Sequence, residues 1–325
     1  MREYVIKRLL QVIPTVLMIT LVVFAMMQAI PGDPLMALLG DAYDEEDAQR
    51  LRQEYGLDKP IISQYLIWLA KLVQGDWGES FVSGRPVLQD VLIRLPITAE
   101  LIVLAMLVAL LIAIPAGTIA ALRQNTWGDY TAMSTALVGI SIPDFFLGIL
   151  LLLVFSVAFN GLLPSSGWVY LPGTCPSLIC EASVWGNLKH VMMPAIALGV
   201  GRAAILTRLL RASLLEIIRM EYVTTARAKG LAERLVILKH ALKNALIPTV
   251  TIMGLQVGFM IGGAIVVETL FAIPGLGTYG INAIILRDYQ QVQGFILLVA
   301  VCFVVVNVLV DLTYSLLDPR IRYNT

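Results

Sequence analysis

The sequence predicts an all-α, polytopic membrane protein with six transmembrane helices. Of the 325 residues, 58% are hydrophobic and only 14% are charged, and the mean hydropathy is +0.82. A soluble domain of this size would lack the polar residues needed to cover so much apolar surface. The apolar residues come in long continuous stretches and do not alternate, which excludes an outer-membrane barrel.

Six apolar stretches are long enough to cross about 30 Å of hydrocarbon as helices. They cover roughly residues 9–30, 97–122, 131–160, 191–210, 247–271 and 294–317. The third exceeds the usual length, and we interpret it as a tilted span with an interfacial turn. The first is too long for a signal-peptide core and lacks a clean cleavage site, so we expect it to be retained as an anchor.

Basic residues gather on one side of these spans. With the N-terminus inside the cell, the cytoplasmic side carries 15 of the 23 Lys and Arg, nine of them between Arg202 and Lys243. The opposite side carries 11 of the 23 Asp and Glu in the 31–98 connection alone. The positive-inside rule therefore predicts that both termini are cytoplasmic.

Three connections are expected on the outer side. In the first, 31–98, we expect a short acidic helix over 44–55 and an amphipathic helix over 61–74, lying on the membrane surface. The second, 162–189, contains Cys175 and Cys180, which an oxidising compartment would allow to pair in a disulfide. Two free thiols are the alternative. The third connection, 273–293, opens with proline and glycine, which is typical of tightly turned or re-entrant backbone.

The most patterned segment is basic and lies between the fourth and fifth spans. It reads as a helix as far as Lys229, and Gly230 can adopt the left-handed conformation that ends a helix. A second helix follows, with Leu235, Leu238 and Leu242 along one face. Two short helices set at an angle would form a rigid knob for docking in water. The alternative is that these charges only hold topology or bind anionic lipid.

Several runs, in the right order along nearly the whole chain, resemble ABC importer permeases of the dipeptide/oligopeptide (peptide/nickel) type. Thr-Ala-Arg-Ala-Lys-Gly-Leu at 225–231 and Asn-Ala-Leu-Ile-Pro at 244–248 look like the cytoplasmic EAA motif of that branch. Pro-Gly-Asp-Pro at 31–34, Gly-Asp-Trp-Gly at 75–78 and Asp-Pro-Arg-Ile-Arg-Tyr at 318–323 are similar to other family motifs. Thr224 replaces the glutamate that names the wider motif, which is usual for the peptide branch.

The resemblance implies a type I ABC importer permease fold in the bacterial inner membrane. Residues 1–30 would form the first transmembrane helix, 31–98 a periplasmic connection, and 97–325 a core of five transmembrane helices that includes a coupling segment over 212–246. The implied cargo is di- or oligopeptides. Relatives with the same architecture import glutathione, haem, nickel chelates or oligosaccharides, and these stay open as alternatives.

The resemblance also implies partners. These are a second homologous permease, two cytoplasmic ATPases, a periplasmic substrate-binding protein and membrane lipid, with no nucleic acid. The chain would not be an enzyme and would hold no cofactor, because the ATPases bind ATP and magnesium. The residues expected to couple the permease to an ATPase are Glu221, Thr224, Thr225, Ala226, Arg227, Ala228, Lys229, Gly230 and Leu231.

Four residues are candidates for the translocation path or its gate. Asp144 follows Pro143 inside the third span, where an acid is costly unless it meets water or a partner. It would either meet the ammonium group of the cargo or hydrogen-bond a neighbouring helix. Glu268, near the outer end of the fifth span, would either belong to an external gate with Pro274 and Gly275 or simply pair locally.

A stripe of small residues and several absent motifs complete the prediction. Gly254, Gly258, Gly262 and Gly263 would allow close helix packing or line the path. The sequence has no G-x-x-x-x-G-K-[ST] phosphate loop, no H-E-x-x-H motif and no spacing that suggests a metal site. A secondary transporter would be expected to show inverted repeats or a chain of membrane acids, and an intramembrane enzyme would need a nucleophile or a metal constellation.

Overall fold

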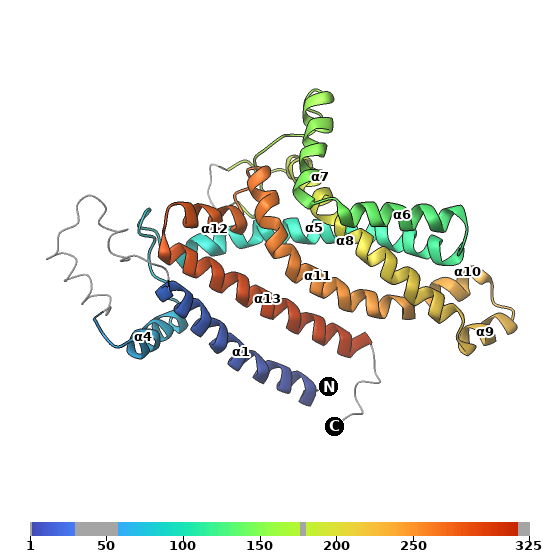
Figure 1. Ribbon diagram of the computed structural model, residues 1–325, viewed down its shortest axis with the longest axis horizontal. Coiled ribbons are helices and arrows are strands. Elements are labelled where there is room, and N and C mark those ends of the chain that lie inside the picture. The colour runs from blue at the N-terminus through green and yellow to red at the C-terminus, as the bar shows by residue number, and fades with distance from the viewer. Residues whose placement is uncertain (1, 30–57, 176–179, 318–325) are drawn as a thin grey trace. The chain divides into compact units, whose positions relative to one another are not determined.

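The computed structural model describes residues 2–29, 58–175 and 180–317, with side chains from residue 10 to residue 310 of these ranges. Within the described residues, every regular element is a helix, and extended backbone forms only isolated bridges. The predicted all-α class is confirmed (Figure 1). The acidic helix predicted for 44–55 and the motif at 318–323 lie outside the described residues.

Five described helices are long and apolar enough to span a membrane. They are contained in α1 (Arg2–Ala29), α5 (Val87–Leu122), α8 (Val184–Ile218), α11 (Leu242–Leu270) and α13 (Tyr289–Leu317). A bent pair supplies a sixth span if it is counted as one. It consists of α6 (Trp127–Ser141) and of α7 (Asp144–Leu151), which continues as the π-helix η2 (Leu152–Ala158).

The third predicted span is broken and not merely tilted. Its two halves meet at an angle of 100°. Pro143 disfavours helical backbone at the residue before it, and Ile142 is extended with ψ of 120°. Pro143 is itself extended, with ψ of 142°, so α7 starts afresh at Asp144. Periodicity and length alone did not predict the size of this bend.

The chain forms two compact units, each made of segments that are far apart in the sequence. Unit 1 contains residues 98–273 and 306–325, whereas unit 2 contains residues 2–97 and 274–305. Unit 2 thus combines the N-terminal part of the chain with the segment after Ile273, and the predicted division into 1–30, 31–98 and 97–325 stays a prediction. Both α5 and α13 begin in unit 2 and end in unit 1.

In unit 1, α8 is the central helix and packs against α6, α7 and α11. Glycines permit its closest approaches to α5. A Cβ on Gly199 would meet the Ala105 carbonyl, and a Cβ on Gly117 would lie 2.9 Å from the Thr207 carbonyl. Because only hydrogen fits at these two positions, the helix backbones can lie nearly in contact.

In unit 2, the amphipathic helix predicted for 61–74 is present as α4 (Ile61–Val73). It packs on α1 through a cluster of the rings of Phe24, Tyr65 and Trp68. The predicted turn after the fifth span is also present, followed by the short apolar helix α12 (Leu276–Ile285). Gly280 of α12 leaves room for the Phe295 ring of α13.

Candidate functional site

The segment between α8 and α11 starts with a break that the sequence did not predict. We expected one helix as far as Lys229, but α8 ends at Ile218 and a new helix, α9, covers Glu221–Ala228. Met220 between them is extended, with ψ of 148°. The break redirects the chain so that one face of α9 packs on its neighbours, and this packing outweighs the helix propensity of the sequence.

The buried face of α9 is narrow. Val223 and Ala226, three residues apart, pack with Val236 and with the partly buried Ile217. Of the predicted coupling residues, Ala226 is thus buried, while the others are exposed: Glu221, Thr224, Thr225, Arg227, Ala228, Lys229, Gly230 and Leu231. The outer face of α9 therefore presents polar groups and charges of both signs, and Ala226 has a packing role.

The structure confirms the left-handed conformation predicted for Gly230. Its φ is +76°, and its N–H donates to the Arg227 carbonyl at 2.9 Å. A Cβ at this position would meet nothing within 4 Å. Glycine is therefore favoured here by the backbone conformation and not by a lack of space.

An exposed ion pair spans the turn at Gly230. Arg227 donates to the Glu233 carboxylate from Nη2 at 2.7 Å and from Nε at 3.1 Å. The hydrogen bond with Glu233 is the main reason why the pKa of Arg227 is raised above its usual value. Both side chains are substantially exposed, so the pair contributes little to stability and remains accessible.

After the turn, α10 (Glu233–Leu235) continues through the π-helix η3 (Val236–Ala241) into α11. The apolar face that we predicted is wrong in part. Leu235 and Leu238 are exposed, and the buried residues are Val236, Ile237 and Ala241. A π-helical turn is wider than an α-helical one, and it changes which side chains face inwards.

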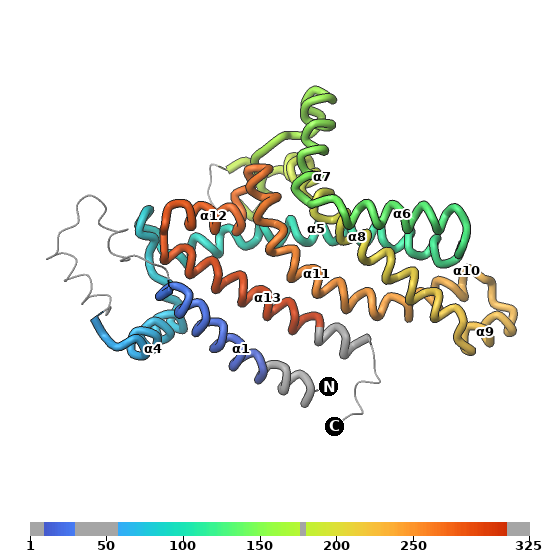
Figure 2. Tube along the Cα trace, viewed as in Figure 1, coloured from blue at the N-terminus to red at the C-terminus, as the bar shows by residue number. Residues whose placement is uncertain are grey.

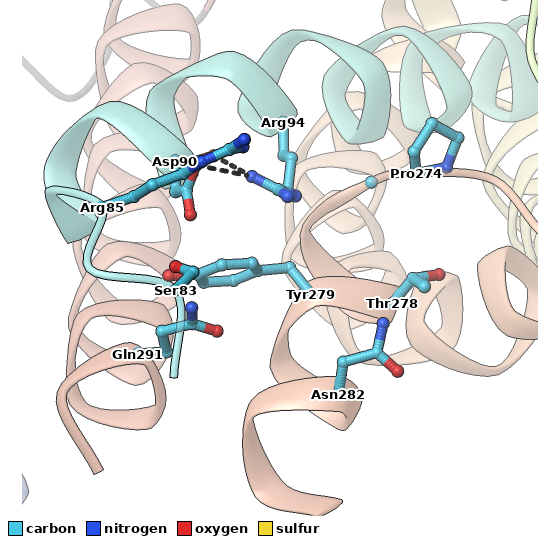
Figure 3. A pocket seen from close by; sticks show the side chains of 10 residues that line it. Ser83, Arg85, Asp90, Arg94, Pro274, Thr278, Tyr279, Asn282 and Gln291 are labelled. Atoms are coloured by element: carbon cyan, nitrogen blue, oxygen red, sulfur yellow. Dashed lines mark hydrogen bonds and ion pairs between the residues drawn. The ribbon is translucent and has the colours of Figure 1, made fainter. Parts of the chain in front are cut away.

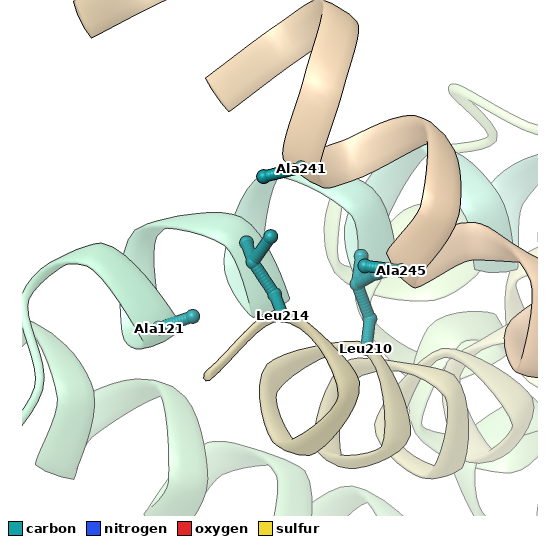
Figure 4. Close-up of a cluster of buried hydrophobic side chains, with 5 residues drawn as sticks. All are labelled: Ala121, Leu210, Leu214, Ala241 and Ala245. Atoms are coloured by element: carbon teal, nitrogen blue, oxygen red, sulfur yellow. The ribbon is translucent and has the colours of Figure 1, made fainter. Parts of the chain in front are cut away.

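The base of this segment joins the ends of three helices. Ala121 of α5, Leu210 and Leu214 of α8, and Ala241 and Ala245 at the start of α11 form one buried cluster (Figure 4). The side chain of Asn244 donates to the Tyr222 hydroxyl at 2.8 Å, which ties α9 to the same base. Figure 2 shows α9 and α10 together at the end of α8. The segment around α9 is therefore joined to the ends of the long helices.

A buried ion pair links α6 to α8, and sequence reasoning missed it. Arg211 donates to both carboxylate oxygens of Asp129 at 2.6 Å, and the N–H of Asn125 donates to the same group at 3.0 Å. The Asp129 side chain is only 3% exposed. The one sequence signal was an acidic residue in the first turn of a helix, which is common for other reasons.

Asp144 lies at the start of α7 and pairs with Arg202 of α8. Arg202 Nη2 lies 3.2 Å from Asp144 Oδ2. A Cβ on Gly201 or on Gly263 would come within 3.3 Å of this pair, so both glycines make space for it. Arg202, one of the charges assigned to the cytoplasmic side, thus lies within α8 against the broken span. The contact of Asp144 with cargo stays a prediction.

Glu268 has no exposed surface. It accepts a hydrogen bond from the Thr98 hydroxyl at 2.5 Å, which ties α11 to α5 within unit 1. Pro274 and Gly275 belong to unit 2, where they line a pocket beside α12 (Figure 3). The gate role of these residues therefore stays a prediction, and local pairing describes Glu268 in this conformation.

The structure also describes the two cysteines of the second connection, the glycine stripe and the acidic, histidine and cysteine side chains. Cys175 and Cys180 are joined, with Cα atoms 6.1 Å apart, a separation usual for disulfides. Gly254 faces Val310 of α13 so closely that a Cβ would overlap it, whereas a Cβ on Gly262 would meet nothing within 4 Å. The glycine stripe is therefore not one uniform face. Among the described residues, no group of His, Cys, Asp and Glu is placed to hold a metal ion.

Comparison with known proteins identifies the family. Residues 113–323 match the family described as "Binding-protein-dependent transport system inner membrane component", and residues 1–102 match the corresponding N-terminal family. The chain belongs to this family. It is therefore an ABC importer permease, a multi-pass protein of the inner membrane and not an enzyme. Membership implies ATPase, binding-protein and permease partners.

Curated relatives of this permease match over nearly their whole length. The dipeptide transport system permease protein DppB of Escherichia coli strain K12 is 42% identical, with 99% of each chain covered. DppB of Alkalihalophilus pseudofirmus is 40% identical over 99% of this chain and 100% of its own. The glutathione transport system permease protein GsiC of Escherichia coli strain K12 is 41% identical over the same shares.

Proposed function

We propose that this permease moves di- or oligopeptides across the inner membrane, powered by two ATPases that dock on the segment around α9. In this arrangement both termini and α9 face the cytoplasm, and a periplasmic binding protein delivers the cargo. A second, homologous permease completes the pathway. The observation that carries the proposal is the exposed, polar face of α9, followed by the turn at Gly230, on a base made from three helix ends.

The contacts of α8 support a mechanism for the proposed coupling. When the ATPases close on ATP, the groove that holds α9 moves, and α9 transmits the displacement to α8 and α11 through its buried base. The pairs Asp129–Arg211 and Asp144–Arg202 connect α8 to both halves of the broken span. Movement of α8 would therefore reposition α6 and α7 as well, and so open the pathway alternately to each side.

Peptide cargo is supported by the relatives, whose names specify dipeptide and glutathione transport. Glutathione is itself a small peptide, so a peptide-like solute is common to both. The binding protein makes much of the selection among cargoes, so the test compares several cargoes in its presence.

The test is ATP-driven uptake by the whole transporter. The chain is co-purified with its partner permease and ATPase subunits and reconstituted in proteoliposomes with the binding protein outside. We expect uptake of labelled dipeptide that requires ATP at the ATPase side. Glutathione and an oligosaccharide serve as competing cargoes. Uptake of oligosaccharide alone would refute peptide cargo, and transport by this chain without any partner would refute coupling through α9.

A further inference from the structure

Unit 2 contains a pocket with a composition that suits a ligand. The cavity has a volume of about 240 Å³ (Figure 3). It is lined by the turn before α5 and the start of α5, by the turn at Pro274 and α12, and by the start of α13. Its volume is smaller than the roughly 300–1,000 Å³ of sites for drug-sized molecules. The pocket therefore suits one end of a small solute and not a whole oligopeptide.

The charged groups of the pocket leave one positive charge in excess. Arg94 donates to the Asp90 carbonyl at 2.8 Å, and the same nitrogen lies 3.4 Å from the Asp90 carboxylate. These two charges offset each other. Arg85 also lines the pocket, is exposed, and makes no ion pair with any described residue. A single excess positive charge suits a monoanion such as a carboxylate better than a doubly charged phosphate.

Tyr279 provides an unused hydrogen-bond donor. Its side chain is only 4% exposed, its ring lies 4.7 Å beneath the Arg94 guanidinium, and its hydroxyl has no hydrogen-bond partner. Burial, together with Asp90 and Asp288, raises the pKa of Tyr279, so the hydroxyl keeps its proton at physiological pH. Buried hydroxyls in proteins nearly always have a partner, and an unpartnered one in a pocket wall therefore points to a ligand.

Asp288, the other nearby acid, is already satisfied. Its carboxylate accepts the Ser80 hydroxyl at 2.6 Å and the backbone N–H groups of Val82 and Gln291 at 3.3 and 3.2 Å. These bonds tie the turn before α5 to the start of α13 and shape the pocket wall. Asp288 keeps its negative charge, but it does not line the pocket, and both of its carboxylate oxygens are engaged by these donors.

We propose that this pocket is a carboxylate-binding site that takes the C-terminal carboxylate of a transported peptide. The inference rests on the proposed peptide cargo. Arg85 supplies the charge, the Tyr279 hydroxyl supplies a directed hydrogen bond, and the Gln291 amide lines the same wall. Arg94 keeps its pairing with Asp90 and holds the tyrosine ring in place by stacking on it.

The experiment measures equilibrium binding to the purified transporter in nanodiscs, without the binding protein. The probes are labelled glycylglycine and glycylglycinamide, which differ only in the terminal carboxylate. We expect the wild type to bind glycylglycine more tightly than the amide. In Tyr279→Phe, affinity for glycylglycine should fall about tenfold, as expected for one hydrogen bond to a charged group, with little change for the amide. Equal affinity of the wild type for both probes, or no binding, would overturn the proposal.

Two controls separate ligand binding from folding. Tyr279→Phe removes only a hydroxyl that has no partner, so the melting temperature should stay the same or rise slightly; a clear fall would show that the hydroxyl is structural. Arg287→Gln removes an exposed charge just after α12 that lines no part of the pocket. It should bind both probes as the wild type does.

A carboxylate could also come from an acidic side chain of the binding protein. This source is examined by titrating ATPase stimulation with ligand-free binding protein. If Tyr279→Phe needs more binding protein but binds glycylglycine normally, the pocket is a docking site and the assignment to cargo is wrong. Uptake of dipeptide by the wild type, measured in parallel, tests the proposed function independently. If the wild type takes up dipeptide but Tyr279→Phe binds glycylglycine as tightly as the wild type does, the carboxylate site is refuted and the proposed function stands.

Discussion

The ion pairs Asp129–Arg211 and Arg227–Glu233 join the same kinds of groups in two very different settings. In the first, both oxygens of a carboxylate that is 3% exposed accept hydrogen bonds from one guanidinium. In the second, the side chains are 37% and 56% exposed. Loss of one partner leaves a buried charge in the first case but only a hydrated one in the second. The first pair therefore holds helices together, whereas the second remains available for a partner.

The same contrast distinguishes the interior of unit 1 from the segment around α9. Polar pairs fix α8 to α6 and to α7, and the apolar cluster fixes the base of α9. The outer face of α9 makes few contacts of its own. These properties suit the proposed coupling, because the base of the segment is held rigidly and its outer face is accessible to a partner. Four substitutions test this division, and their expected effects on stability decrease in order.

Asp129→Asn should have the largest effect. It leaves the Arg211 guanidinium without its counter-charge and should cost about 3 kcal/mol of folding stability. Thermal unfolding of the purified permease in detergent measures the loss. Arg208→Gln, an exposed position on the same helix, is the control and should be neutral. The double variant Asp129→Asn, Arg211→Gln should lose less than the sum of the single changes; simple additivity would mean that the pair does not join α6 to α8.

Asp144→Asn should have the second largest effect. Asp144 and Arg202 make one contact of 3.2 Å, against two of 2.6 Å between Asp129 and Arg211, so we expect a smaller loss of about 2 kcal/mol. Because the pair links α7 to α8, peptide uptake should fall more than protein yield. Gly263→Ala should have a similar effect on uptake, since a methyl group would crowd the same pair. Full uptake by both variants would show that the broken span does not depend on this contact.

Gly230→Val should cost about 1–2 kcal/mol, the usual penalty for a side chain in left-handed backbone. Its main effect should be on coupling, with ATP hydrolysis continuing while uptake is lost. Gly161→Val is a matched control, because Gly161 also has a positive φ and open space around it but lies outside the α9 segment. It should retain coupling. Normal ratios of uptake to hydrolysis in Gly230→Val would mean that the turn is not needed for force transmission.

Arg227→Gln should leave the melting temperature unchanged, because the pair that it breaks is exposed. Any loss of uptake then reflects contact with the ATPase. Glu233→Gln breaks the same pair from the other side and is the natural comparison. If uptake falls only in Arg227→Gln, the arginine contacts a partner directly. Equal falls in both variants would instead indicate that the bridge across the turn matters, and a destabilised Arg227→Gln would contradict its assignment as a surface group.

The sequence predicted the features that depend on local chemistry. Apolar length predicted the membrane spans, Gly230 predicted a left-handed turn, and periodicity predicted α4 almost to the residue. Motifs in order along the chain predicted the family. The sequence did not predict which acid pairs with which base. Arg202 and Arg211 are nine residues apart on one helix, yet they pair with residues on the two sides of the bend.

Composition and apolar length were thus enough to place this chain in a membrane, and its ordered motifs were enough to place it in a family, because hydrophobic length, backbone conformation and motifs are properties of short segments. The sharp bend at Pro143, the burial of Ala226 and the unpartnered Tyr279 hydroxyl required the folded structure. Each depends on which groups from distant parts of the chain meet, and whether a polar group is satisfied is a property of its neighbours in space and not of its neighbours in sequence.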